Sequence, residues 1–93
     1  MNTSYNVEFE ISAQKTLKKM DRHQALLIMG WISKNLVGCS DPRAHGKALV
    51  SDHKGKWRYR IGDYRVIADI NDETVTVLVL AIGRRREIYK SIS

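Results

Sequence analysis

The stretch that most constrains the fold of this chain is the alternating run of residues 57–65. Aromatic or aliphatic residues alternate with arginines over its first five positions, and a second extended run begins after Gly62-Asp63. Strict alternation is typical of a strand with one buried face, and Gly-Asp between two such runs is typical of a two-residue hairpin turn. The sequence therefore predicts an antiparallel hairpin in which Arg60 lies opposite Arg65.

The predicted hairpin places three arginines on one face, which indicates an anion-binding surface. Arg58, Arg60 and Arg65 would all project from the same side of the two strands. Like charges directly opposite each other destabilise a sheet. A fold that accepts this repulsion on an ordered surface is expected to bind an anion there, and phosphate matches the guanidinium group well. A solvated strand face is the alternative interpretation.

The composition is that of a small basic domain. The chain has 93 residues and a formal net charge of +6, so we expect one domain over residues 1–93 and an acidic partner. No apolar run approaches the roughly 20 residues that span a membrane. Cys39 is the only cysteine, which excludes an internal disulfide and fits a reducing cytoplasm. The carboxylates and histidines show no metal-ligand spacing, so we expect neither a metal nor another cofactor.

The first third of the chain predicts a strand followed by two helices. Residues 5–11 alternate between apolar and polar side chains, as a half-buried strand does. Ser12 is the expected N-cap of the first helix. Asp21 and Gln24 resemble a capping box for a second helix, which is expected to end at Gly38. The short connection between the two helices predicts a helical hairpin.

The rest of the chain predicts strands. Residues 64–70 complete the hairpin, and residues 75–82 are almost continuously apolar, which predicts a central strand that is covered on both faces. The connector 38–56 shows little periodicity, although residues 48–50 can add a short strand. The predicted fold is α+β in the order β-α-α-β-β-β, with the helical hairpin packed on a roughly four-stranded, mainly antiparallel sheet. We expect the first strand at a sheet edge or beside the last strand.

This element order and two sequence blocks together resemble the RelE/ParE toxins of bacterial and archaeal toxin–antitoxin pairs, in particular the RelE branch. The blocks are residues 55–67 (GKWRYRIGDYRVI) and 82–89 (IGRRREIY). The resemblance implies a RelE-like fold and a metal-independent, ribosome-dependent mRNA endoribonuclease that inhibits translation. In that reaction the ribose 2′-hydroxyl attacks the adjacent phosphate and leaves a cyclic phosphate and a 5′-hydroxyl. An acidic, RelB-like antitoxin would block the toxin, and the complex would bind operator DNA through the antitoxin.

The resemblance also assigns roles to individual positions. Arg58 and Arg60 match two basic residues of the first hairpin strand, and Arg65 would stabilise the phosphate in the transition state. Arg85 would assist the leaving group, and Tyr89 would stack on or orient a base. Five further basic residues are expected to bind RNA: Lys47, Lys54, Lys56, Arg84 and Arg86.

One departure from the family pattern concerns the general base. Typical RelE toxins have lysines at the positions of Arg58 and Arg60, and one of those lysines is assigned as the base. A lysine can lose its proton near neutral pH when it is crowded, whereas an arginine essentially cannot. The proton would then pass to water, to the substrate or to another group. His53 and Glu87 are the nearest candidates in sequence, with an exposed loop histidine and an arginine-orienting carboxylate as the respective alternatives.

Two other functions remain open at this point. The first is a ParE-like toxin that inhibits DNA gyrase without nuclease chemistry; the joint presence of the arginines and Tyr89 argues against it. The second is a non-toxic, antitoxin-binding remnant, which the arginines at positions 58 and 60 keep open. Trp31 lies off the apolar stripe of the second helix and is therefore a candidate antitoxin contact.

Overall fold

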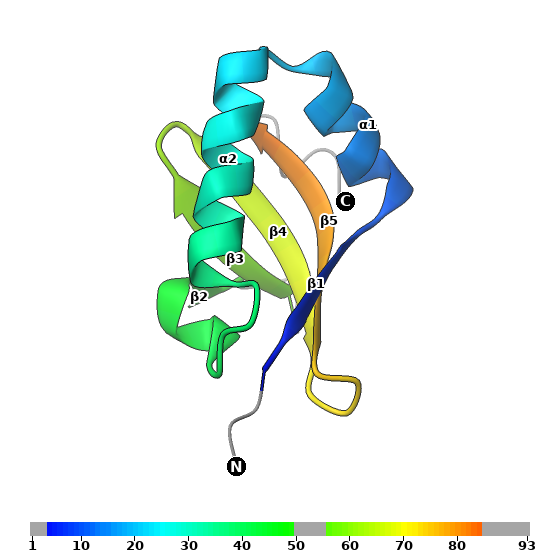
Figure 1. Ribbon diagram of the computed structural model, residues 1–93, viewed down its shortest axis with the longest axis vertical. Helices are drawn as coiled ribbons and strands as arrows, with labels where there is room; N and C mark the ends of the chain where they lie inside the picture. The colour runs from blue at the N-terminus through cyan, green and yellow to red at the C-terminus, as the bar shows by residue number, and fades with distance from the viewer. Residues whose placement is uncertain (1–3, 50–55, 85–93) are drawn as a thin grey trace.

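The computed structural model describes residues 4–49 and 56–84, in which two helices pack on one face of a five-stranded sheet (Figure 1). The strand order is β1-β5-β4-β3-β2, and only the β1–β5 pair is parallel. The elements are β1 (Asn6–Phe9), α1 (Ile11–Lys19), α2 (Arg22–Asn35), the 3₁₀ helix η1 (Pro42–His45), β2 (Lys47–Ala48), β3 (Lys56–Ile61), β4 (Tyr64–Asn71) and β5 (Thr76–Arg84).

The predicted α+β fold is confirmed. Strand β1 lies both at the sheet edge and beside β5, as expected, and β5 is an interior strand. The central strand is β4 rather than β5. The fifth strand is β2, whose two residues overlap at Ala48 with the segment 48–50 that was expected to add a short strand.

The helix ends are only partly those that the sequence predicts. Asp21 caps α2, and its carboxylate accepts a hydrogen bond from the Gln24 backbone N–H at 3.3 Å. Ser12 does not cap α1, because this helix already begins at Ile11. The Ser12 hydroxyl instead donates to the Leu80 carbonyl at 3.1 Å and so ties the helix to β5. Gly38 follows α2 in the left-handed region, with φ +75°.

The main core lies between the helices and the sheet. Tyr59, Val66 and Val79 contribute fully buried side chains from the sheet, and Ile28 and Ile32 contribute them from α2. Trp31, a candidate antitoxin contact, is only partly exposed, and its role in such a contact stays a prediction. Its ring packs against this core, with its centroid 5.6 Å from that of Tyr59. The large apolar side chains that α2 does expose include those of Leu26 and Leu27.

A bulge in β5 sets which residues face each side of the sheet. Ala68 pairs with Val79 and Ile67 pairs with Ala81, so Leu80 is an extra residue on β5. After the bulge, Ile82 belongs to the helix-facing core. Ile67 and Ala81 form a second, smaller buried cluster. The side of the sheet that faces away from the helices therefore has a small apolar cluster of its own.

A hydrogen-bonded triad fixes η1 against the sheet. Asp72, in the β4–β5 turn, accepts two hydrogen bonds of 3.0 Å from the Arg43 guanidinium and one of 2.7 Å from the Tyr5 hydroxyl. Arg43 also lies over the Trp57 ring, 6.0 Å from its centroid. Three segments that are distant in sequence thus meet at one carboxylate, and η1 is held beside β3.

We expect this triad to make stability depend on pH. The Arg43 guanidinium, and after it the Tyr5 hydroxyl, hold the pKa of Asp72 below its usual value. Because the folded pKa is lowered, the contribution to stability is complete above the unfolded value of about 4 and is lost as pH falls through the folded value. Asp72→Asn should therefore lower the urea midpoint at neutral pH and change it much less in strong acid. Glu73→Gln, in the same turn, is the control. An Asp72→Asn effect of equal size at both pH values would contradict this linkage.

Candidate anion-binding site on the β3–β4 hairpin

The hairpin has the predicted register. Arg60 lies opposite Arg65, and Ile61 lies opposite Tyr64 across the turn. Gly62 has φ +59°, the left-handed conformation that a primed two-residue turn needs and that glycine adopts without strain. The two like charges are therefore held directly opposite each other on the sheet.

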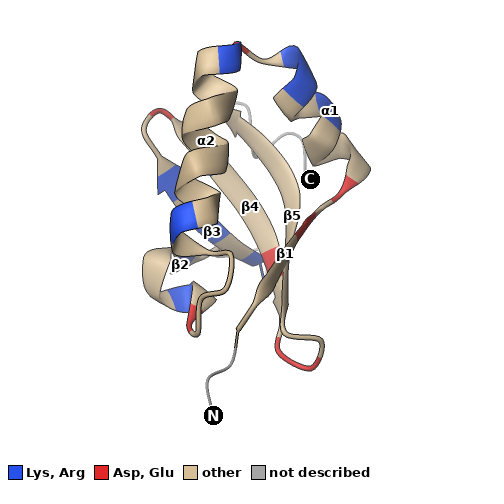
Figure 2. Cartoon of the chain, viewed as in Figure 1, with Lys and Arg blue, Asp and Glu red and all other residues tan. Residues whose placement is uncertain are grey.

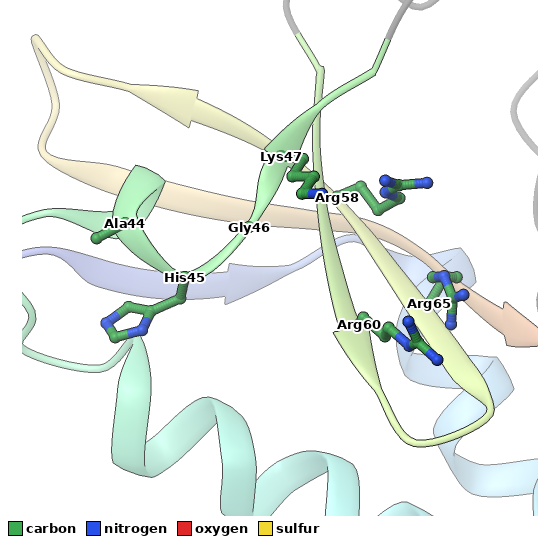
Figure 3. A pocket seen from close by; sticks show the side chains of 7 residues that line it. All are labelled: Ala44, His45, Gly46, Lys47, Arg58, Arg60 and Arg65. Atoms are coloured by element: carbon green, nitrogen blue, oxygen red, sulfur yellow. The ribbon is translucent and has the colours of Figure 1, made fainter.

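The three hairpin arginines line a pocket on the side of the sheet away from the helices (Figure 3). The pocket has a volume of about 490 Å³, and its other lining residues are Ala44, His45, Gly46 and Lys47. None of the described residues that line it is acidic. Acidic residues elsewhere lie mainly in the turns and around β1 (Figure 2). A pocket with four cationic side chains and no carboxylate among them is suited to an anion.

Arg65 is the most unusual member of this group. Its side chain is buried, with only 6% of the residue exposed, whereas Arg60 is exposed. One guanidinium nitrogen of Arg65 donates to the Tyr64 carbonyl at 3.3 Å. The β5 residue opposite Arg65 is Gly83, which brings no side chain to that position. A buried guanidinium keeps its charge, and its field is screened less than in water, so Arg65 is suited to bind an anion strongly.

Gly46 allows the corner between η1 and β2 to rest directly on β3. A Cβ atom at this position would collide with the Arg58 carbonyl oxygen, and it would lie 2.8 Å from the Tyr59 ring and 2.9 Å from the Trp57 ring. This close approach places Lys47 opposite Arg58 in the β2–β3 register. Gly46 could not be predicted as part of the site, because nothing in the sequence of the connector indicates which strand it contacts.

His45 and Tyr59 lie near the arginines but are poorly placed to take a proton from a bound molecule. The His45 imidazole points away from the three arginines (Figure 3), and its edge-on contact is with Trp31, at 6.2 Å between ring centroids. The Tyr59 hydroxyl donates to the Pro42 carbonyl at 2.8 Å. Burial raises the pKa of Tyr59 well above its ordinary value, so this phenol stays protonated.

Two of the expected RNA-binding residues lie outside this pocket. Lys56 is on the same face as the arginines, but its ammonium group lies 3.9 Å from the Asp69 carboxylate. Arg84 is opposite Tyr64, on the other face, with its guanidinium 5.8 Å from the centroid of the Tyr64 ring. Their RNA-binding roles stay predictions. Six other expected site residues are outside the described part of the chain: His53, Lys54, Arg85, Arg86, Glu87 and Tyr89.

Residues 4–49 and 56–84 contain neither a candidate metal-binding cluster nor a candidate membrane-spanning helix. In these residues, no group of three or more histidine, cysteine, aspartate or glutamate side chains is arranged to bind a metal ion. No helix in the same residues is long and apolar enough to cross a membrane.

Known proteins resemble this chain over nearly its whole length. Toxin RelG of Mycobacterium tuberculosis is 29% identical over 86 residues, which are 92% of this chain and 97% of the relative. The toxin–antitoxin complex RelBE2 of the same organism contains a chain with a TM-score of 0.77 and 27% identity; the match covers 89% of this chain and 93% of that one. A mutant of Escherichia coli toxin RelE in the free state gives a TM-score of 0.73 at 21% identity, with coverage of 95% and 93%.

A family model accounts for the same region. The model that describes the ParE toxin of the type II toxin–antitoxin system parDE matches residues 7–89. This match includes both helices, the arginine hairpin and every strand residue of the sheet except Asn6. The solved RelE structures share the arrangement of two helices on a mixed sheet. The chain therefore belongs to the ParE toxin family of type II toxin–antitoxin systems, within the RelE/ParE superfamily.

Proposed function

We propose that this chain is a ribosome-dependent mRNA endoribonuclease that inhibits translation, and that the hairpin pocket binds the scissile phosphate. The observation that carries the proposal is the pocket itself, where Arg58, Arg60, Arg65 and Lys47 surround about 490 Å³ without an acidic residue among the lining groups. Arg60 and Arg65 are held directly opposite each other, and a bound phosphate would relieve the repulsion between their charges. The RelE names of similar toxins favour the same activity.

The proposed reaction is a transfer within the RNA. The ribose 2′-oxygen forms a bond to the adjacent phosphorus, and the bond from phosphorus to the 5′-oxygen of the next nucleotide breaks. The products are a 2′,3′-cyclic phosphate and a 5′-hydroxyl. Arg60 and Arg65 would stabilise the extra negative charge on the phosphorane, and Arg58 would hold the neighbouring backbone. In the same proposal Arg85 assists the leaving oxygen and Tyr89 orients a base.

We also propose an acidic antitoxin as the regulatory partner in the cytoplasm. The solved RelBE2 structure of Mycobacterium tuberculosis, which contains a chain similar to this one, is a toxin–antitoxin complex. The formal net charge of +6 favours an acidic partner of this kind. Operator DNA would be bound through that antitoxin.

The test is cleavage of a defined message by the purified chain. Programmed ribosomes carrying an mRNA in the A site are incubated with the protein, and primer extension locates the cuts. We expect discrete cuts within the A-site codon, with cyclic-phosphate and 5′-hydroxyl ends. A message with a 2′-deoxynucleotide at the cut position should stay intact, because the nucleophile is missing. Cuts that are independent of the 2′-hydroxyl, or no cuts at all, would overturn the proposal.

The second candidate is inhibition of DNA gyrase, which the parDE description of the matching family model favours. A gyrase inhibitor needs no phosphate-transfer site, so the pocket would have no direct role in toxicity. DNA damage during expression, with the message intact, would support this candidate. Binding to ribosomes with the message intact would support a non-toxic remnant.

A further inference from the structure

We propose that Lys47 is the general base of the reaction and takes the proton from the 2′-hydroxyl. The inference rests on the proposed endoribonuclease function and supplies a role that the three hairpin arginines do not fill. An arginine keeps its proton at any working pH and can only bind and stabilise charge. A lysine has a neutral form with a lone pair, which can accept a proton.

The other pocket groups leave this role to Lys47. The described lining residues that carry ionisable side chains are His45, Lys47 and the three arginines. The imidazole of His45 faces Trp31 and points away from the arginines (Figure 3). Among these described residues, Lys47 therefore has the only proton-accepting side chain on the arginine side of the pocket.

The position of Lys47 follows from the register of the sheet. Lys47 pairs with Arg58 across β2 and β3, and directly paired residues project from the same face. Figure 3 shows its side chain extending toward Arg58. Gly46 makes this pairing possible because it has no Cβ to collide with the Arg58 carbonyl. A base on β2 can thus approach an RNA held by cations on β3 and β4.

Lys56 provides an internal comparison. It lies on the same face and also neighbours Arg58, but it does not line the pocket and its ammonium group lies 3.9 Å from Asp69. Between described residues, no carboxylate forms an ion pair with Lys47. Lys47 is exposed, which leaves its amino group accessible to a nucleotide.

The proposed step conserves atoms and charge. The neutral Lys47 amine takes the 2′-hydroxyl proton and becomes an ammonium ion as the oxygen attacks phosphorus. The 5′-oxygen leaves with the bonding electron pair and takes a proton from water. The ammonium ion then returns its proton to the solvent, which restores the amine for the next cut.

The test separates the charge of Lys47 from its ability to accept a proton. Lys47→Arg keeps the charge, so it should bind ribosomes within about threefold of wild type yet cut about 10²- to 10⁴-fold more slowly in single-turnover assays. The wild-type rate should reach a plateau at high pH. The rate of Lys47→Ala should continue to rise with pH, because hydroxide replaces the missing base. Lys56→Ala should weaken binding to the ribosome, but its cleavage rate should still reach a plateau at high pH.

Three outcomes would overturn the assignment. The first is a Lys47→Arg variant that cuts within about threefold of the wild-type rate. The second is a Lys47→Ala variant whose cleavage rate still reaches a plateau at high pH. The third is the loss of that plateau in His53→Ala or Glu87→Gln instead. In all three the wild type still cuts, so the proposed function survives. A wild type that fails to cut refutes the endoribonuclease function, and this assignment with it. Thermal melts of each variant establish that it is folded.

Discussion

Arg65→Met should reduce mRNA cleavage by about 10²- to 10³-fold, the loss typical of removing one group that stabilises transition-state charge. The same substitution should change the free energy of unfolding by only about 1 kcal/mol, because losing the hydrogen bond to the Tyr64 carbonyl is offset by relief of the repulsion from Arg60. Arg65 lies opposite Arg60, and removing one of two opposed like charges relieves a repulsion of up to about 1 kcal/mol. Methionine fills much of the buried volume with a flexible apolar side chain, so no large cavity forms. Cleavage should therefore fall by a much larger factor than stability changes.

The measurements are single-turnover cleavage on programmed ribosomes and urea unfolding of the free protein. Arg22→Met is the matched control, because Arg22 is exposed at the start of α2, on the helix side of the sheet. This control should leave both quantities close to wild type. If Arg65→Met unfolds much more easily than wild type, Arg65 is mainly a structural residue. Cleavage at the wild-type rate would remove it from the site.

Gly46→Ala should have the largest effect on stability. The added methyl group meets the Arg58 backbone and two aromatic rings of β3 rather than the end of a flexible side chain, so the corner between η1 and β2 has to move. Overpacking of this kind typically costs about 1–3 kcal/mol. Because Lys47 follows directly, the same movement should also slow cleavage.

A second glycine gives the control for Gly46. Gly30 lies inside α2, and a Cβ added there would meet nothing within 4 Å. Gly30→Ala should therefore raise the free energy of unfolding by roughly 0.5–1 kcal/mol through the better helix propensity of alanine. Both variants are measured by urea unfolding under the same conditions. A Gly46→Ala protein as stable as Gly30→Ala would show that the corner does not depend on contact with β3.

The parts of the fold that are local in sequence were predictable. The hairpin register could be read from an alternating pattern and a Gly-Asp turn, both within residues 57–65. The capping of α2 by Asp21 is a contact over three residues. By contrast, the Ser12 hydroxyl bonds to Leu80, which is 68 residues away, and local spacing alone predicted a helix cap instead.

The geometry of the candidate site was predictable only where one hairpin supplies it, although Lys47 was among the residues expected to bind RNA. Arg58, Arg60 and Arg65 share a face because of strand alternation alone. Lys47 and Gly46 join them through pairing with a strand on the far side of an aperiodic connector, which no local pattern indicates. The face on which Arg84 lies depends on the bulge at Leu80, since one extra residue reverses the alternation of everything after it.

The parallel pairing of β1 with β5 has a consequence for the time at which the protein becomes active. Asn6 pairs with Thr76 and Phe9 with Val79, so the first strand finds its partner only after nearly all of the chain between them has been made. Pairing over such a separation is slow, because a long loop has to close first. The sheet therefore cannot be completed on a nascent chain whose β5 strand is still inside the ribosome, and the arginine hairpin lacks its full support until that strand has emerged. This delay gives an inhibitor that is already present the opportunity to bind the new toxin before it matures.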